Sequence, residues 1–242
     1  GSIDELIVIK KELLESEING FEDYIASNNG NILAHYKFNA GEGDIVYDHS
    51  GNQNHGTING ATWVIPPTPG ENNSLSFDGV NDRVVVPHNS AYDFNDQFTI
   101  QGWFNHKSDI NERYIITKGR DIHPASSHRF WGLRSNSDGS LFFEIIMQNS
   151  GYNSFQIDPS FALNTWNHFS LVYDGSSLKF YLNGVESWSN PLSGNLQNGT
   201  YDLSVGYFPH TDLNNYGYFF KGGIDDISLW NVALSSDQIQ PF

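Results

Sequence analysis

Two carboxylates stand where the chain could build a site for a hard cation. Asp48 lies in the segment YDHSGNQNHG (residues 47–56), which is dense in oxygen donors, and Asp225 begins the last expected strand. Ca²⁺ prefers carboxylates, amide oxygens and backbone carbonyls as ligands. Asp225 shares strand parity with Ile227 and Leu229, which should face the core. We therefore expect its carboxylate to point inward and to need a partner or a metal.

Two further residues could complete this metal shell. Asn52 offers an amide oxygen and His55 a backbone carbonyl, and both lie in the same loop as Asp48. We therefore predict a structural calcium ion (Ca2+) held by Asp48, Asn52, His55 and Asp225. The alternative is that the two aspartates cap turns by accepting backbone hydrogen bonds.

A second group of residues suits sugar recognition. Four of the five arginines fall in one stretch with aromatic residues among them: Arg113, Arg120, Arg129 and Arg134, with Tyr114, Phe130 and Trp131. A sugar needs a flat apolar face for stacking and planar donors for its hydroxyls or carboxylates, which Trp and Arg supply. We predict ligand contacts at Arg120, Arg129, Trp131 and Arg134. Strand alternation puts Arg129 with Trp131 and Arg134 on the opposite face, and the alternative is that Trp131 packs in the core.

An aromatic segment near the end of the chain, YFPHTDLNNYGYFF (residues 207–220), is rich in Asn and nearly uncharged. This composition suits a neutral glycan or a protein partner, so Tyr207, His210 and Tyr216 are further predicted contacts. The alternative is a loop that its own aromatics pin against the edge of the fold. The tryptophans of the strand segments are assigned to packing: Trp63, Trp103, Trp166 and Trp230.

The sequence offers no catalytic constellation. Hydrolysis of a glycosidic bond uses two carboxyl groups on either side of that bond. Glu144 stands alone on its strand, and Asp225 and Asp226, as neighbours, should point to opposite sheet faces. No nucleophile elbow, phosphate loop or His-rich zinc motif occurs in the chain. We predict a protein that is not an enzyme and has no catalytic residues.

The elements that must position these residues are short strands separated by turn clusters. Hydrophobic alternation predicts strands over residues 32–38, 74–77, 83–86, 98–104, 114–118, 130–134, 141–147, 168–173, 178–182, 203–207 and 223–230. Asx-Gly pairs such as Asp174-Gly175 and Asn183-Gly184 supply turns between them. The pattern predicts an all-β protein, a two-sheet antiparallel β-sandwich, with a helix only over about residues 11–27.

Composition supports a folded domain and limits its partners. The 242 residues include 28 acidic and 12 basic side chains, and the net charge of −16 disfavours nucleic acid. With 38% hydrophobic and 14% aromatic residues, the chain has enough apolar material for one large β domain. The absence of cysteine excludes a disulfide scaffold and zinc–thiolate sites. No apolar run is long enough to span a bilayer, so no membrane insertion is expected.

The two ends of the chain resemble each other. Residues 3–18 (IDELIVIKKELLESEI) align without gaps on residues 224–239 (IDDISLWNVALSSDQI). We interpret residues 1–2 as a cloning remnant, residues 3–31 as a tail strand and linker helix like the end of a preceding repeat, and residues 32–242 as one domain. The first strand would then pack on this domain or exchange with another copy or a neighbouring repeat.

Several segments carry a resemblance to a known family. They are residues 33–63 (LAHYKFNAGEGDIVYDHSGNQNHGTINGATW), 74–87 (SLSFDGVNDRVVVP), 98–104 (FTIQGWF), 166–185 (WNHFSLVYDGSSLKFYLNGV) and 222–239 (GGIDDISLWNVALSSDQI). In this order they resemble the laminin-G-like domains of the concanavalin A-like jelly-roll superfamily, in the form common in secreted bacterial proteins. The resemblance implies two curved antiparallel sheets packed face to face, a structural calcium near Asp225 and, in most members, a non-catalytic role.

These observations together predict a lectin-like carbohydrate-binding module of a larger secreted or cell-surface protein, with a polysaccharide or glycan as its partner. The alternative is an adhesive or structural repeat that makes protein or cell-surface contacts without binding glycan. A jelly-roll glycoside hydrolase or polysaccharide lyase is a third interpretation, which the missing motifs disfavour.

Overall fold

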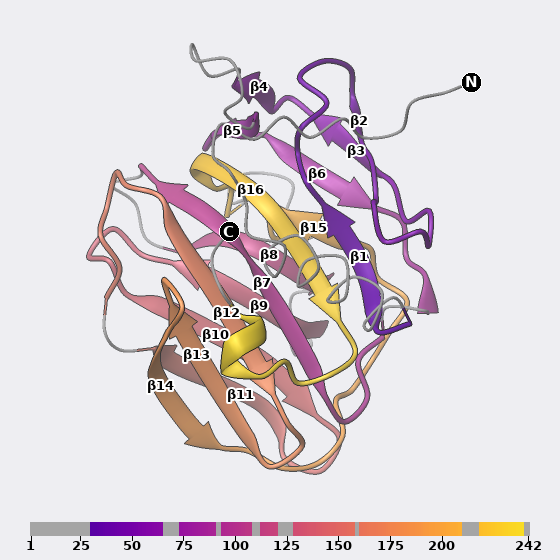
Figure 1. Cartoon of the computed structure of the whole chain (residues 1–242), viewed down its shortest axis with the longest axis vertical. Helices are drawn as coiled ribbons and strands as arrows, with labels where there is room; N and C mark the ends of the chain where they lie inside the picture. The colour runs from indigo at the N-terminus through magenta and orange to yellow at the C-terminus, as the bar shows by residue number, and fades with distance from the viewer. Residues whose placement is uncertain are drawn as a thin grey trace, which may run out of the picture.

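The chain folds as a sandwich of two antiparallel β-sheets in the computed structural model (Figure 1). The structure describes residues 30–64, 73–90, 93–107, 112–120, 128–157, 160–209 and 218–239. Within these residues nearly all regular structure is strand, and no helix is long and apolar enough to cross a membrane. The fold class predicted from the sequence is confirmed.

Sheet A contains the last strand of the described chain near its middle. Its strands run in the order β14-β13-β12-β7-β16-β5-β4, and β1 also pairs with β16. The strands are β1 (Ile32–Tyr36), β4 (Thr62–Val64), β5 (Ser74–Asp78), β7 (Phe98–His106), β12 (Asn167–Tyr173), β13 (Ser177–Leu182), β14 (Val185–Pro191) and β16 (Lys221–Trp230). Strand β16 thus joins the first strand to the centre of the sheet.

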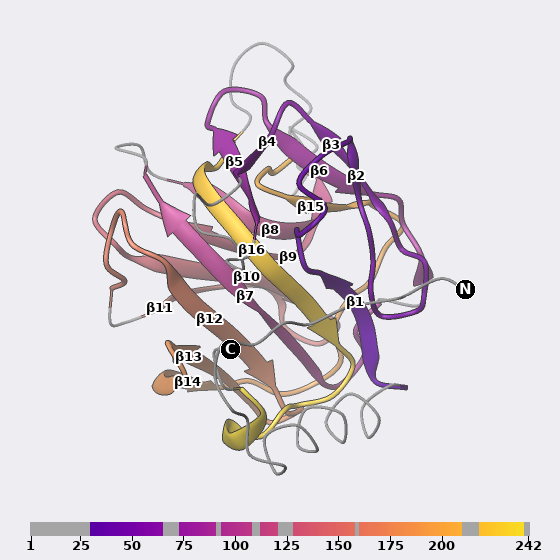
Figure 2. The same cartoon turned by 45° about the horizontal axis from the view of Figure 1, so that its top comes forward.

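Sheet B lies behind sheet A in both views of the molecule (Figures 1 and 2). Its strands run in the order β11-β10-β9-β8-β15-β6-β3-β2. They are β2 (Ile45–Val46), β3 (Gly56–Asn59), β6 (Arg83–Val86), β8 (Arg113–Arg120), β9 (His128–Ser135), β10 (Leu141–Met147), β11 (Gly151–Ile157) and β15 (Leu203–Val205). Each sheet therefore has one face toward the other sheet and one face turned outward.

Large apolar side chains fill the space between the two sheets. The ring of Phe98 on β7 lies 6.1 Å from that of Phe143 on β10, across the sandwich, and 5.6 Å from that of Tyr173 on β12. Each fully buried side chain of this size stabilises the fold by about 2 kcal/mol. A polar link crosses the same layer, where Nδ1 of His106 lies 2.7 Å from Oγ of Ser135.

The C-terminal segment covers part of the outer face of sheet A. It ends in the short 3₁₀ helix η2 (Ser236–Gln238), which lies over β12 and β13 (Figure 1). Thr99 fixes this segment, because its Oγ1 donates to the carbonyl of Val232 at 2.8 Å and accepts from the N–H of Leu234 at 3.0 Å. The segment closes a second apolar cluster of Ile32, Val172, Tyr181, Trp230, Leu234 and Ile239.

Each strand predicted from the sequence overlaps a strand of the structure. The sequence did not indicate β2, β3, β4, β11 and β14, which are short or carry mostly exposed side chains. Strands β11 and β14 are edge strands with polar sequences, so they lack the hydrophobic alternation that marks a half-buried strand. The predicted helix over residues 11–27 and the first copy of the end repeat lie outside the described residues.

Candidate functional site

The turn around Asp48 occupies both oxygens of that carboxylate. Oδ1 accepts hydrogen bonds from the backbone N–H groups of His35 and Ser50, both at 2.9 Å. Oδ2 accepts from the hydroxyl of Ser50 at 2.8 Å and from the backbone N–H of Asn54 at 3.0 Å. Because Asp48 is buried, these four bonds compensate for its lost hydration and tie the loop to β1.

The other two loop residues predicted as calcium ligands brace the same turn. Nδ2 of Asn52 donates to the carbonyls of Ile32 at 2.9 Å and Leu33 at 3.2 Å. Nδ1 of His55 accepts the backbone N–H of Asp48 at 3.0 Å. Within the described ranges, no group of three or more His, Cys, Asp or Glu side chains could hold a metal ion. The loop fits the turn-capping alternative, and the calcium site stays a prediction.

Asp225 lies on the outer face of sheet A and not toward the core. A β-bulge interrupts β16 between Asp225 and Ser228, and Asp226 adopts a left-handed φ of 49°. Ile224 and Ile227, three residues apart, therefore both belong to the core. The inward direction expected for Asp225 from its parity with Ile227 is wrong, because the bulge reverses the alternation.

Asp225 has a tryptophan and a histidine as neighbours across the sheet. It pairs with Trp103 of β7, which pairs in turn with His168 of β12. The rings of Trp103 and His168 meet edge to face, with centroids 5.2 Å apart. Phe104 and Phe169, the next residues along these strands, belong to the core. Alternation therefore places Trp103 and His168 on the outer face.

The carboxyl group of Asp225 is poorly compensated. Among the described residues its one hydrogen bond comes from the backbone N–H of Asp226, 2.9 Å from Oδ1. Burial, with the Asp226 carboxylate beside it, raises the pKa of Asp225 to about 8. Burial lowers the pKa of His168 to about 4, against the attraction of Asp226, and no described residue bonds its buried Nδ1. The neighbouring Asp226 contacts a different histidine: Nε2 of His35 lies 3.4 Å from Oδ1 of Asp226.

An exposed tryptophan lies further along the same face. Trp166 directly precedes β12 and is 41% exposed. Its indole reaches β16, because a Cβ built on Gly223 would lie 2.6 Å from Cη2 of the ring. Asn105 pairs with Gly223 and is buried, and its side-chain oxygen has no partner in the described part of the chain. We call this set the Asp225 face: Trp103, Asn105, Trp166, His168, Gly223 and Asp225.

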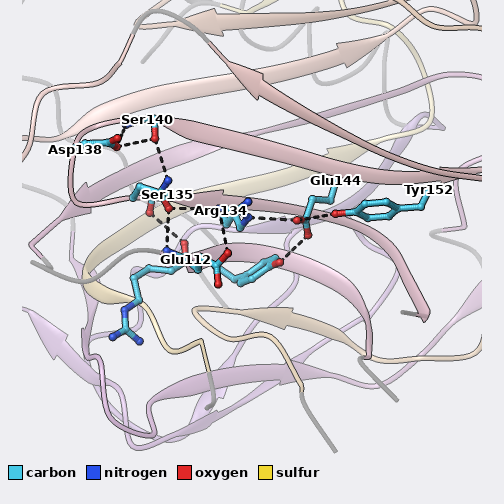
Figure 3. A network of polar contacts seen from close by, with 10 residues as sticks. Glu112, Arg134, Ser135, Asp138, Ser140, Glu144 and Tyr152 are labelled. Atoms are coloured by element: carbon cyan, nitrogen blue, oxygen red, sulfur yellow. Dashed lines mark hydrogen bonds and ion pairs between the residues drawn. The ribbon is translucent and has the colours of Figure 1, made fainter. Parts of the chain in front are cut away.

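The outer face of sheet B carries a second polar cluster (Figure 3). Glu144 of β10 is 2% exposed. Its Oε1 accepts from Nε of Arg134 at 3.3 Å and from the hydroxyl of Tyr152 at 2.9 Å, and its Oε2 accepts from the hydroxyl of Tyr114 at 2.6 Å. Arg134 also lies over the ring of Phe142, 4.1 Å from the centroid. Arg134, a predicted sugar contact, is thus engaged by Glu144, which does not stand alone.

The structure assigns the other predicted sugar contacts to different places. Trp131 is 1% exposed and packs in the core against Phe94, with ring centroids 5.5 Å apart. Its prediction as a ligand contact is wrong, because the alternation of β9 directs it inward. Tyr207 stacks on Phe219 at 4.7 Å, and the guanidinium of Arg83 lies 5.9 Å from its ring. The side chains of Arg120, Arg129, His210 and Tyr216 lie outside what the structure describes.

Sequence reasoning assigned the tryptophans of the Asp225 face to packing. Alternation along β7 could have placed Trp103 outside, because Ile100 and Phe104 face the core. Trp166 lies just before its strand, where alternation does not apply. Two observations therefore needed the structure, the reach of Trp166 to β16 and the bulge that turns Asp225 outward.

Comparison with known proteins assigns the chain to a family. A profile of the concanavalin A-like lectin/glucanases superfamily, Laminin_G_3, matches residues 78–240. The chain belongs to this superfamily as a laminin-G-like domain. Mouse pappalysin-1 is 26% identical over 155 residues, which are 60% of this chain and 9% of that protein. The chain thus spans less than a tenth of that relative's length.

Solved structures with the same fold include binding domains of larger proteins. The binding domain of paraclostridial mosquitocidal protein 1 superposes with a TM-score of 0.65 at 14% identity, over 88% of this chain and 51% of that chain. Domain 4 of AbnA, a GH43 extracellular arabinanase from Geobacillus stearothermophilus solved with arabinotriose, gives 0.63 at 18% identity, over 86% and 96%. The botulinum neurotoxin serotype D binding domain gives 0.63 at 17% identity, over 88% and 51%. At these identities the likeness shows a common fold.

Proposed function

We propose that this domain is a non-catalytic carbohydrate-binding module of a larger extracellular protein and that it binds glycan through the Asp225 face. The observation that carries the proposal is the exposed indole of Trp166 beside polar groups with unused hydrogen-bonding capacity. Sugar rings stack on aromatic side chains and direct their hydroxyls to such groups. The arabinotriose bound to the AbnA domain supports a glycan as a ligand for this fold.

The carboxyl groups of the two polar clusters support binding over hydrolysis. Glycosidic hydrolysis needs two carboxyl groups on either side of the bond to be cleaved. Asp225 and Asp226 are adjacent on one strand, and the backbone N–H of Asp226 donates to Oδ1 of Asp225. Glu144 lies on the other sheet and is engaged by Arg134 and two tyrosines. Neither arrangement flanks a sugar from two sides.

Calcium at the predicted site is not part of this proposal. Tyr36 of β1 bridges to Asp48 on one side and pairs with Ile227 of β16 on the other. Strand β1 therefore separates the Asp48 loop from the strand that carries Asp225. Both oxygens of Asp48 also have backbone or hydroxyl donors, and a calcium site at these residues stays a prediction that chelation tests.

Affinity electrophoresis tests the proposed function. Native gels would contain neutral or anionic polysaccharides, each with calcium chloride or with a chelator. We expect retardation by at least one polymer, loss of retardation in Trp166→Ala, and no change in Tyr47→Ala, which removes an exposed aromatic near β2 of sheet B. Loss on chelation would support the calcium site. A protein that no polymer retards would overturn the proposal and favour the adhesive-repeat alternative.

A further inference from the structure

The Asp225 face contains three polar groups that lack a full set of hydrogen-bond partners. They are the carboxyl group of Asp225, Oδ1 of Asn105 and Nδ1 of His168. Within the described residues, the backbone N–H of Asp226 is the one donor that reaches any of the three. A carboxyl group accepts hydrogen bonds at both oxygens and, because the raised pKa keeps Asp225 mostly protonated at pH 7, it also has one O–H to donate. A ligand with hydroxyl groups, which donate and accept, therefore suits this face.

The face also disfavours a ligand with a negative charge. The carboxylate of Asp226 acts on Asp225 by like-charge repulsion and has Nε2 of His35 3.4 Å from its Oδ1. The buried imidazole of His168 is neutral at pH 7 because burial lowers its pKa. The described cations nearest along β7 and β16 are Lys107 and Lys221, which are exposed and lie together at the strand end. A carboxylate or sulfate held on this face would meet the negative charge of Asp226 in a partly buried place, whereas the raised pKa leaves Asp225 itself mostly protonated at pH 7.

The stacking surface is a single indole seated on a glycine. A Cβ on Gly223 would lie 2.6 Å from Cη2 and 2.8 Å from Cζ2 of Trp166, so any side chain at this position would lift the ring. Gly223 and Asp225 are two residues apart on the same strand face, about 7 Å along the strand. A sugar ring stacked on the free side of Trp166 would bring its hydroxyls within reach of Asp225.

We propose that the Asp225 face is a subsite for one uncharged sugar residue, which stacks on Trp166 and donates hydroxyls to Asp225. Gly223 is the positioning residue that seats the indole. This inference rests on the proposed glycan-binding function and specifies its ligand class: neutral saccharides bind, and uronic acids and sulfated sugars do not.

The test compares two neutral polymers, debranched arabinan and laminarin, with two anionic ones, polygalacturonate and heparin. We expect binding to at least one neutral polymer and to neither anionic one. Trp166→Ala and Asp225→Ala should each weaken that binding roughly tenfold or more. Gly223→Ala should weaken it similarly while the melting temperature stays near that of the wild type, because Trp166 lies at the surface.

A spectroscopic readout separates positioning from general damage. The emission of Trp166, taken as the difference from Trp166→Phe, should shift to longer wavelength in Gly223→Ala, because the lifted indole meets more water. Unchanged emission and unchanged affinity in Gly223→Ala would overturn the role of Gly223.

The polymer panel also separates the two levels of the proposal. Binding to anionic polymers alone, lost in Lys221→Ala, would overturn the neutral-sugar subsite and leave the glycan-binding function standing. Neutral-polymer binding that survives both Trp166→Ala and Asp225→Ala would overturn the subsite. Absence of binding to all four polymers would overturn the subsite and the proposed function together.

Discussion

Each sheet presents a partly or wholly buried carboxyl group on its outer face, and the two groups differ in their partners. Glu144 of sheet B receives hydrogen bonds from Arg134, Tyr114 and Tyr152 (Figure 3). Asp225 of sheet A receives, from the described residues, one backbone N–H and has a second carboxylate beside it. The first arrangement stabilises the sandwich, because a buried charge is stable only when it is bonded. The second leaves capacity for a ligand.

This difference bears on which of the predicted sugar contacts could bind a ligand. Arg134 looked like a ligand-binding residue because Arg and aromatic side chains alternate in its stretch. In the folded chain its guanidinium is held by Glu144 and the ring of Phe142. The polar groups with unused hydrogen-bonding capacity are those of the Asp225 face, where a partly buried acid with few hydrogen bonds lowers the stability of the fold. Residues of binding sites often lower stability in this way.

The largest expected effect on stability comes from removing Glu144, the carboxylate that receives three side-chain hydrogen bonds. Glu144→Ala should lower the free energy of unfolding by about 4 kcal/mol, because it leaves the nearly buried Arg134 with only the half-exposed Glu112, 3.9 Å away, as a counter-charge. Urea unfolding of both proteins measures this difference. Glu186→Ala is the control: its pair with Lys179 is solvent-exposed, and its hydrogen bond from the Tyr181 hydroxyl is 3.2 Å long. It should change stability by about 1 kcal/mol or less. Equal effects of the two substitutions would contradict a structural role for the Glu144 cluster.

Replacing Asp225, the carboxyl group with few partners, should stabilise the protein, whereas replacing Glu144 should destabilise it. The pKa of Asp225 rises from its ordinary value of 3.8 to about 8 on folding. The folded state therefore holds this proton more tightly than the unfolded state, and its stabilising effect is full below about pH 4 and is lost as the pH rises toward 8. Asp225→Asn removes this loss, so its effect on stability should be more favourable at pH 8 than at pH 5 by about 3–4 kcal/mol.

Urea unfolding at pH 5 and pH 8 measures this second effect. The gain from Asp225→Asn should be larger at pH 8 than at pH 5. A substitution that destabilises the protein at pH 8 would show that Asp225 is compensated by contacts of its own, and the contrast with Glu144 would fail.

His168, on the same face as Asp225, should lower the stability of the protein at acidic pH. Its pKa falls from 6.5 to about 4 on folding, because burial disfavours the charged imidazole. The unfolded chain takes up this proton first, so stability is full above about pH 6.5 and is lost as the pH falls toward 4. His168→Gln should therefore reduce the loss of stability between pH 6.5 and 4.5 by about 2 kcal/mol. Parallel pH curves for the variant and the wild type would contradict the burial of a neutral His168.

The smallest expected effects lie within the Glu144 cluster. Tyr114 is buried and Tyr152 is exposed, although both hydroxyls bond the same carboxylate. Tyr114→Phe should cost about 2 kcal/mol, since it removes a charge-assisted bond from a dry site, whereas Tyr152→Phe should cost about 0.5 kcal/mol. Urea unfolding would rank the two, and the reverse order would mean that the network is anchored from the solvent side.

Much of the fold followed from local patterns in the sequence. Strands such as β7 and β12 alternate or run apolar between turn residues, and these signals depend on near neighbours only. The candidate site depended on relations that no local pattern contains. The bulge after Asp225 reversed the direction of that side chain, and the register of β9 on β10 brought Arg134 to Glu144.

The buried position of Trp131 shows the same limit. A tryptophan between two arginines suits either a sugar platform or a core residue, and the sequence left both open. In the structure Trp131 packs in the core against Phe94, which comes from a distant segment of the chain, so no local pattern could decide between the two. The position of Trp166 at the surface likewise depends on a distant residue, Gly223, on which its ring packs.

Amide chemical-shift mapping with a neutral trisaccharide tests the central claim most directly. Arabinotriose would be titrated into the labelled domain, and laminaritriose would serve as a second probe. The Asp225 face predicts that the largest shifts fall on Asn105, Trp166, Gly223 and Asp225, with Arg134 and Tyr152 unaffected. Shifts centred on Arg134 and the outer face of sheet B, or no shifts with either sugar, would contradict it.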